Sequence, residues 1–123
     1  MNDLIEKLKT TCEWLNDEYS LNQGGCMYAA YIISKHLEKL NIRYTVNMWY
    51  DENNDTYHIS IVINGIDINK TDYILHDHIE NITVDSKWLM DFNNRNEKFD
   101  FIWQRKYKKI VRDTFKKLFI EFK

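Results

Sequence analysis

The sequence predicts an α+β domain, with N-terminal helices packed on a small antiparallel sheet and an amphipathic helix at the C-terminus. Two helix-period patterns open the chain, alternating patterns follow over residues 42–69, and a long helix-period pattern ends it. The chain has 123 residues, of which 44% are hydrophobic, enough for one domain with a single core. We therefore expect one domain over residues 1–123.

Residues 1–41 carry the signals of two helices. Asn2 or Asp3 is placed to cap the first helix, whose apolar positions recur every three or four residues. Those positions are Leu4, Ile5, Leu8, Cys12, Leu15 and Tyr19. Cys12 lies on this stripe, so we interpret it as a small buried hydrophobic residue. The second helix is predicted over residues 26–40, with Asn41 as its C-terminal stop.

After residue 41 the hydrophobic period changes to two, which predicts strands. The three predicted strands are residues 42–50, 57–63 and 66–69. Asn64–Gly65, between the second and third strands, is a strong signal for a two-residue hairpin turn. Such a turn places Ile63 opposite Ile66 and thereby sets the register of the whole hairpin.

The last part of the chain predicts a short strand at residues 82–84, a helical turn at residues 86–92 capped by Ser86, and a final helix over residues 103–122. Residues 98–123 carry 9 basic and 3 acidic side chains, whereas residues 1–97 carry 8 basic and 16 acidic ones. A basic helix can meet nucleic acid, a membrane surface or an acidic partner. We favour its docking on the acidic body of its own domain.

The segment Gly24–Gly25–Cys26 places a thiol directly after two of the three glycines of the chain. At the first residue of a helix, a thiol meets the positive end of the helix dipole and unpaired backbone N–H groups, which favour the thiolate. The same N–H groups can stabilise the oxyanion that forms when a thiolate attacks a carbonyl. Gly24 and Gly25 permit positive φ and let a substrate backbone approach. Cys26 is therefore the candidate nucleophile.

A cysteine nucleophile needs a base, and His58, at the start of the second strand, is the candidate. In the predicted hairpin the numbers of paired residues sum to 129, so His58 falls opposite Thr71 and shares a face with Asp67 and Asn69. Asn69 is the diagonal neighbour of His58 and our first choice for the group that orients the imidazole. A loop that differs by one residue would bring Asp72 opposite His58, which makes Asp72 the second choice.

The segments "GGCMYAAYIISKHLEKLNIRYTV" and "HISIVINGIDIN" resemble the core of the papain-like and transglutaminase-like cysteine enzymes. In that superfamily a cysteine begins a helix, a histidine lies early on a following strand, and an Asn or Asp lies on the next one. The resemblance covers about residues 22–72 and implies a minimal, cofactor-free domain that acts on a protein or peptide substrate. The implied chemistry is peptide or isopeptide cleavage, amidase action or acyl transfer. An oxyanion-hole role is implied for Gln23, with Asn22 as the alternative.

Two other groups of side chains invite a functional interpretation. His76, Asp77 and His78 raise the question of a metal, but no further Cys or His completes a tetrahedral set, so we predict a polar loop and no metal site. Trp49 falls on the polar face of its strand. It lines a substrate groove or an interface, or else the terminal helix covers it.

The alternative function is that of a catalytically silent accessory protein, of a viral or mobile-element type, that inhibits a partner by binding it through Trp49 or the basic helix. Nucleic-acid binding through that helix is a weaker third expectation, because the rest of the chain is acidic. Two cysteines make no disulfide framework, and neither a secretory signal nor an apolar run of membrane-spanning length is visible. These features predict a cytoplasmic protein that does not enter membranes.

Overall fold

The fold combines four helices with a four-stranded antiparallel sheet, in a computed structural model that describes residues 1–51, 56–70, 78–96 and 101–122. This arrangement confirms the predicted α+β class. The elements are α1 (Asn2–Tyr19), α2 (Cys26–Lys39), β1 (Thr45–Asp51), β2 (Thr56–Ile63), β3 (Ile66–Asp67), β4 (His78–Ile82), α3 (Ser86–Asn96) and α4 (Phe101–Ile120). The strand order in the sheet is β3-β2-β1-β4.

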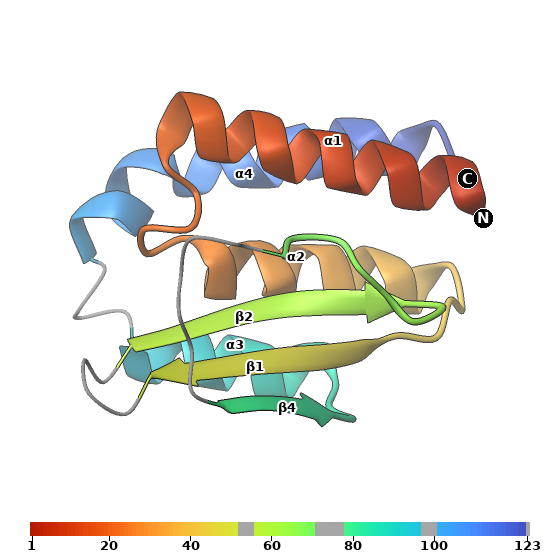
Figure 1. Cartoon of the computed structure of the whole chain (residues 1–123). Coiled ribbons are helices and arrows are strands. Elements are labelled where there is room, and N and C mark those ends of the chain that lie inside the picture. The colour runs from red at the N-terminus through yellow and green to blue at the C-terminus, as the bar shows by residue number, and fades with distance from the viewer. Residues whose placement is uncertain (52–55, 71–77, 97–100, 123) are drawn as a thin grey trace.

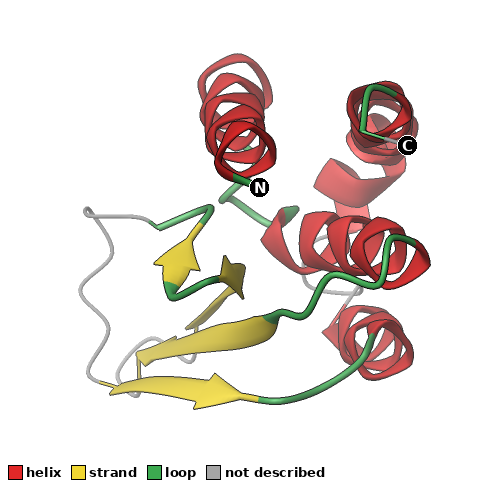
Figure 2. Cartoon of the chain, turned by 90° about the vertical axis from the view of Figure 1, so that its right-hand side faces the viewer, coloured by secondary structure: helices red, strands yellow, loops and turns green. Residues whose placement is uncertain are grey.

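The helices α2 and α3 line one face of the sheet, and α1 and α4 lie side by side next to α2, on the side away from α3 (Figures 1 and 2). α2 is the central helix, because it contacts β2, α3 and α4. The core lies between α2 and the sheet, where Ile59, Ile61 and Ile63 of β2 are 0–1% exposed. Val46, the partner of Ile61 on β1, is likewise fully buried. Alternation along β2 therefore directs these side chains toward α2 and leaves His58 and Ser60 on the opposite face.

The apolar stripe of α1 is buried as predicted, and Cys12 within it is 1% exposed. The predicted cap is wrong, because α1 already begins at Asn2, with Met1 as the N-cap and no side-chain cap bond. The amide of Ile5 donates to the carbonyl oxygen of Met1 and closes the first turn. Asn2 and Asp3 thus lie inside the helix, one and two residues after the N-cap position from which a side chain accepts hydrogen bonds of the free backbone amides. At the end of α2, Asn41 adopts φ +56°, as a stop residue should.

The hairpin has the predicted register, with Ile63 paired to Ile66 and Val62 to Asp67. Both turn residues have positive φ, +52° at Asn64 and +78° at Gly65, the signs that a type I′ turn requires. β3 is shorter than predicted, since it ends at Asp67. The Asp67 carboxylate accepts the amide of Asn69, and this local bond competes with continued strand pairing.

Two predictions for the second half of the chain are wrong. The fourth strand is β4 at His78–Ile82, which ends where the predicted strand at residues 82–84 began. The polar-loop prediction for His76 and Asp77 lies outside the described residues, whereas His78 belongs to β4. Ser86 does not cap α3, because its hydroxyl donates to Glu38 on α2. Asp85 performs the capping, accepting the amide of Trp88 at 2.9 Å.

α4 docks through its apolar stripe, on which Val111, Phe115 and Phe119 are 0–1% exposed. An ion pair between Lys7 and Glu121 ties the end of the chain to α1. Within the described residues, no helix combines the length and the hydropathy that crossing a membrane demands.

Candidate active site

The turn before α2 places the thiol of Cys26 at a helix N-terminus. Gly24 adopts φ +118°, a conformation that strains any residue with a Cβ, and Gly25 is the N-cap. The amide of Gly25 donates to Leu21, and its carbonyl oxygen accepts from Ala29 in the first helical bond. Cys26 is therefore the first residue of α2, where the helix dipole and the free amides act most strongly. This is the position that the sequence predicted for it.

Asn69 is the residue at which the separate parts of the predicted site meet. Its backbone carbonyl oxygen lies 2.7 Å from Nε2 of His58. Its side-chain amide donates to Oδ1 of Asn22 at 2.9 Å, which ties the turn before α2 to the end of the hairpin. Asn69 also lines a small internal cavity together with Cys26 and Ser60. The turn before α2 and the hairpin, more than thirty residues apart in the sequence, thus both reach Asn69.

The contact with His58 uses the main chain of Asn69 rather than its side chain. A carbonyl oxygen can only accept a hydrogen bond, so Nε2 must carry the proton and Nδ1 holds the lone pair of the neutral ring. Burial lowers the pKa of His58 below its ordinary value of 6.5, although the Asn69 carbonyl and the charge of Asp67 act in the opposite direction. A neutral imidazole of fixed tautomer is the form that a general base requires.

Asp67 organises the polar part of the sheet face that points away from α2. Its carboxylate accepts the Ser60 hydroxyl at 2.6 Å, the Asn47 amide at 3.0 Å and the backbone amide of Asn69 at 2.9 Å. Ser60 is 1% exposed, so this network satisfies polar groups that water hardly reaches. The sequence analysis placed Asp67 on the face of His58 but missed Ser60 and Asn47. The available signal was their alternation with apolar residues, Ser60 with Ile59 and Ile61 on β2 and Asn47 with Val46 and Met48 on β1.

Trp49 lies beside His58 on this same outward face. The two residues are direct partners in the β1–β2 ladder, and their ring centroids are 6.5 Å apart. Ile79 pairs with Trp49 from the other side and is 57% exposed. The row Ile79–Trp49–His58 therefore runs from solvent into the protein. The groove or interface role of Trp49 stays a prediction.

The site is closed. Cys26 is 3% exposed and His58 is fully buried. The cavity beside Cys26 has no room for a water molecule. Cys26 begins the helix on the isoleucine side of β2, whereas His58 stands on the other side of that strand, and Asn69 at the strand edge contacts both regions. Any substrate must therefore open the edge of the hairpin to reach the thiol.

The remaining predicted site residues are placed differently. Gln23 is exposed in the turn, where its backbone amide donates to Ser20. Asn22, the alternative, is the residue of this turn that bonds to Asn69. Asp72 lies outside the described residues, as does Thr71, which the hairpin register predicts opposite His58. No cluster of three or more His, Cys, Asp or Glu side chains able to hold a metal occurs in the described part of the chain.

Comparisons with protein-family models, with curated proteins and with solved structures found no match for this chain. The resemblance to papain-like and transglutaminase-like enzymes therefore remains a prediction from residues 22–72. The convergence at Asn69 is an argument from this chain alone.

Proposed function

We propose that the protein is a cysteine-dependent hydrolase or acyltransferase of the peptidase, isopeptidase or amidase type. The observation that carries the proposal is that Asn69, at one edge of the hairpin, lines a pocket with Cys26 on one side of β2 and contacts His58 on the other. Sequence reasoning named these three residues from a pattern of spacing, and the His58–Asn69 contact and the pocket shared by Cys26 and Asn69 support the proposal. Cys26 is assigned as the nucleophile, His58 as the base and Asn69 as the positioning residue.

In the proposed reaction, Cys26 Sγ forms a bond to the acyl carbon of the substrate. Once the edge of the hairpin has opened, His58 accepts the thiol proton and returns it to the leaving amine as the carbon–nitrogen bond breaks. The amide groups at the start of α2 stabilise the oxyanion of the tetrahedral intermediate. Water then hydrolyses the thioester to the acid, or a second amine takes the acyl group. The Asn69 carbonyl supports this role because it holds the His58 proton on Nε2.

Acylation by p-nitrophenyl acetate tests the proposal without knowledge of the natural substrate. The expected result is release of p-nitrophenolate and an acetyl group on Cys26, found by peptide mass spectrometry. Cys26→Ala should abolish the adduct, whereas the matched variant Cys12→Ala should keep it. His58→Gln should slow acylation at least about a hundredfold, the low end of what a general base contributes. Equal acylation of both cysteines, or a rate that His58→Gln leaves unchanged, would refute the proposal.

The closed site favours a second candidate, the catalytically silent accessory protein. A thiol that is 3% exposed beside a cavity without room for water is typical of a packed core. In that case the scaffold acts only by binding and inhibiting a partner. Cys26→Ala would then leave the inhibition of the partner intact, whereas an enzyme would lose its effect.

A further inference from the structure

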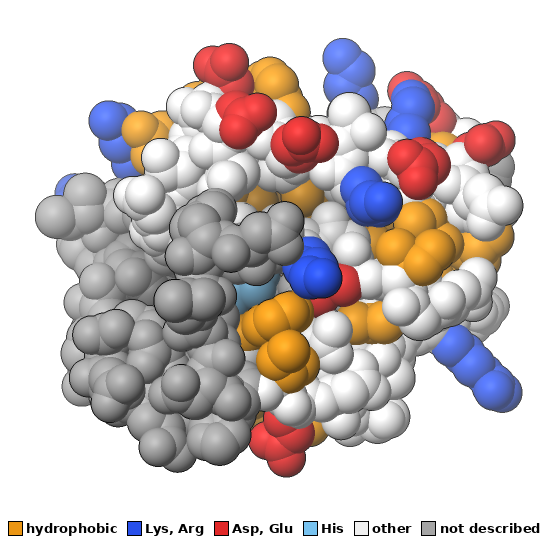
Figure 3. Space-filling view, viewed as in Figure 1, with side chains coloured by type: hydrophobic (Ala, Val, Ile, Leu, Met, Phe, Trp, Pro, Cys, Tyr) orange, Lys and Arg blue, Asp and Glu red, His pale blue; other side chains and the backbone are white. Residues whose placement is uncertain are grey.

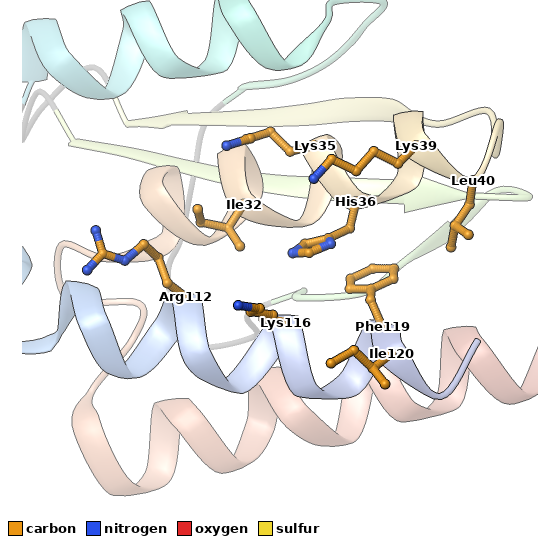
Figure 4. A pocket seen from close by; sticks show the side chains of 9 residues that line it. All are labelled: Ile32, Lys35, His36, Lys39, Leu40, Arg112, Lys116, Phe119 and Ile120. Atoms are coloured by element: carbon orange, nitrogen blue, oxygen red, sulfur yellow. The ribbon is translucent and has the colours of Figure 1, made fainter. Parts of the chain in front are cut away.

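A groove between α2 and α4 lies away from the candidate active site, along the C-terminal half of α2 (Figure 4). Its volume is about 290 Å³. Four cationic side chains and several apolar ones line it. The cations are Lys35, Lys39, Arg112 and Lys116. We call this feature the cationic groove.

The cations of the groove come from both of its walls. Lys35 and Lys39 extend from α2, and Arg112 and Lys116 extend from α4 (Figure 4). Among the residues that the structure describes, no acidic one belongs to the lining. Four like charges in one depression repel one another, and an anionic ligand would relieve that repulsion. The predicted docking of the basic helix on acidic parts of its own domain therefore does not extend to Arg112 and Lys116.

Acidic residues near the groove in sequence are engaged elsewhere. Glu38 accepts hydrogen bonds from Tyr44 and from Ser86. Asp113 pairs with Lys109 at 3.2 Å, and Glu121 pairs with Lys7. Each of these carboxylates has a partner outside the lining of the groove, and none of them belongs to that lining.

Apolar side chains form the rest of the lining. Ile32 is buried between the helices, and His36 stacks on Phe119 with ring centroids 4.7 Å apart. Ile120, at the end of α4, is 57% exposed. An exposed apolar side chain beside four cations favours a ligand that carries both acidic and apolar groups.

We propose that the cationic groove binds an acidic, amphipathic helical segment of a partner protein. Its carboxylates would pair with the lysines and Arg112, and its apolar side chains would cover Phe119 and Ile120. A nucleic acid fits less well, because phosphates make no use of apolar side chains and the rest of the chain is acidic. Figure 3 shows acidic side chains gathered over α1, whose exposed acids are Asp3, Glu6, Glu13, Asp17 and Glu18. A membrane fits less well because the feature is concave, whereas interfacial helices present a protruding apolar face. This proposal does not depend on acyl chemistry at Cys26.

Fluorescence anisotropy with a labelled peptide of about 18 residues tests the proposal, the peptide being built from Glu and Leu with Leu at helical spacing. The full-length protein should bind it, bind the Gln-for-Glu counterpart at least about tenfold more weakly, and lose affinity as salt rises. Charge reversal by Arg112→Glu with Lys116→Glu should weaken binding at least about tenfold. Ile120→Ser should weaken it as well.

The matched control reverses two exposed cations of α4 outside the groove, Lys106→Glu with Lys117→Glu. It changes net charge by the same amount, so a loss equal to that of the groove variant would show only long-range attraction and overturn the proposal. Failure to bind the peptide at low salt would overturn it as well. A single-stranded oligonucleotide or phosphatidylserine vesicles that bind more tightly than the peptide, with dependence on Arg112, would overturn it in favour of that ligand class. Self-association that the groove variant abolishes would assign the groove to a second copy instead.

Discussion

His58 Nε2 and the carbonyl oxygen of Asn69 lie 2.7 Å apart, and this contact joins the base of the proposed site to the loop that follows the hairpin. A main-chain acceptor has a consequence for mutagenesis, because a side-chain substitution at Asn69 does not remove it. The side chain of Asn69 instead holds the turn before α2 through Asn22. Mutagenesis can therefore separate the role of the Asn69 carbonyl from that of its side chain.

We predict that Asn69→Ala lowers the free energy of unfolding by about 1 kcal/mol, the usual net contribution of one hydrogen bond. Asn22→Ala should cost a similar amount, and the double variant should cost less than the sum, because both changes remove the same bond. Urea denaturation of the four proteins measures this cycle. The ¹⁵N chemical shifts of His58 should continue to report the Nε2–H tautomer in Asn69→Ala. Loss of that tautomer would show that the side chain, not the carbonyl, positions the ring.

The lowered pKa of His58 predicts a loss of stability in mild acid. The unfolded state takes up a proton near the ordinary value of 6.5, whereas the buried ring takes one up only at lower pH. Between those two values the unfolded state binds more protons, so the free energy of unfolding falls as pH decreases. The contribution is fully present above pH 6.5 and diminishes below it, by at most about 1.4 kcal/mol per pH unit.

Urea denaturation at a series of pH values from neutral to mildly acidic tests this prediction. His58→Gln keeps a polar side chain but has no group that titrates in this range, so its slope between those pH values should be smaller than that of the wild type. The other three histidines are unchanged and provide the background slope. Identical slopes in both proteins would contradict the assignment of a lowered pKa to His58.

The two cysteines should differ in reactivity toward iodoacetamide. Burial raises the pKa of Cys12 to about 12, and the charge of Asp67 acts in the same direction. Cys12 therefore holds almost no thiolate at pH 8, and only detachment of α1 exposes it. Cys26 lies directly after the turn of residues 21–25, whose local opening costs less than the loss of a helix. Peptide mass spectrometry should find Cys26 modified first. Modification of Cys12 at an equal or higher rate would contradict both the burial argument and the proposed nucleophile.

Local signals that act over a few residues were read correctly from the sequence. Asn64–Gly65 fixed the hairpin register, and the glycine pair before an apolar run located the start of α2 at Cys26. One error occurs where a distant residue decides the local structure. Ser86 looked like a cap, but Glu38 on another helix takes its hydroxyl and leaves the capping to Asp85.

In the proposed site, too, local spacing was predictable from the sequence and contacts between distant residues were not. Spacing identified Asn69 as the neighbour of His58, because the turn type alone determines which residues pair. Spacing did not show that the contact uses the carbonyl oxygen, since that depends on Asn22 attracting the side chain. The sequence also did not predict that the cavity beside Cys26 is closed, because packing between α2 and β2 closes it.

Asp67→Ala should be the most destabilising of these substitutions, because Asp67 accepts three hydrogen bonds on the outward sheet face. Its removal deprives the buried Ser60 hydroxyl and the Asn47 amide of their acceptor, and each buried polar group left unsatisfied costs about 1–3 kcal/mol. Asp67→Asn keeps an acceptor oxygen and should cost less. Ser60→Ala in the Asp67→Ala background should restore part of the lost stability, since it removes the Ser60 hydroxyl that Asp67→Ala leaves without its acceptor. Urea denaturation compares the wild type, the two Asp67 variants, Ser60→Ala and the double variant, and costs of Asp67→Ala and Ser60→Ala that add in the double variant would show that Asp67 does not act through Ser60.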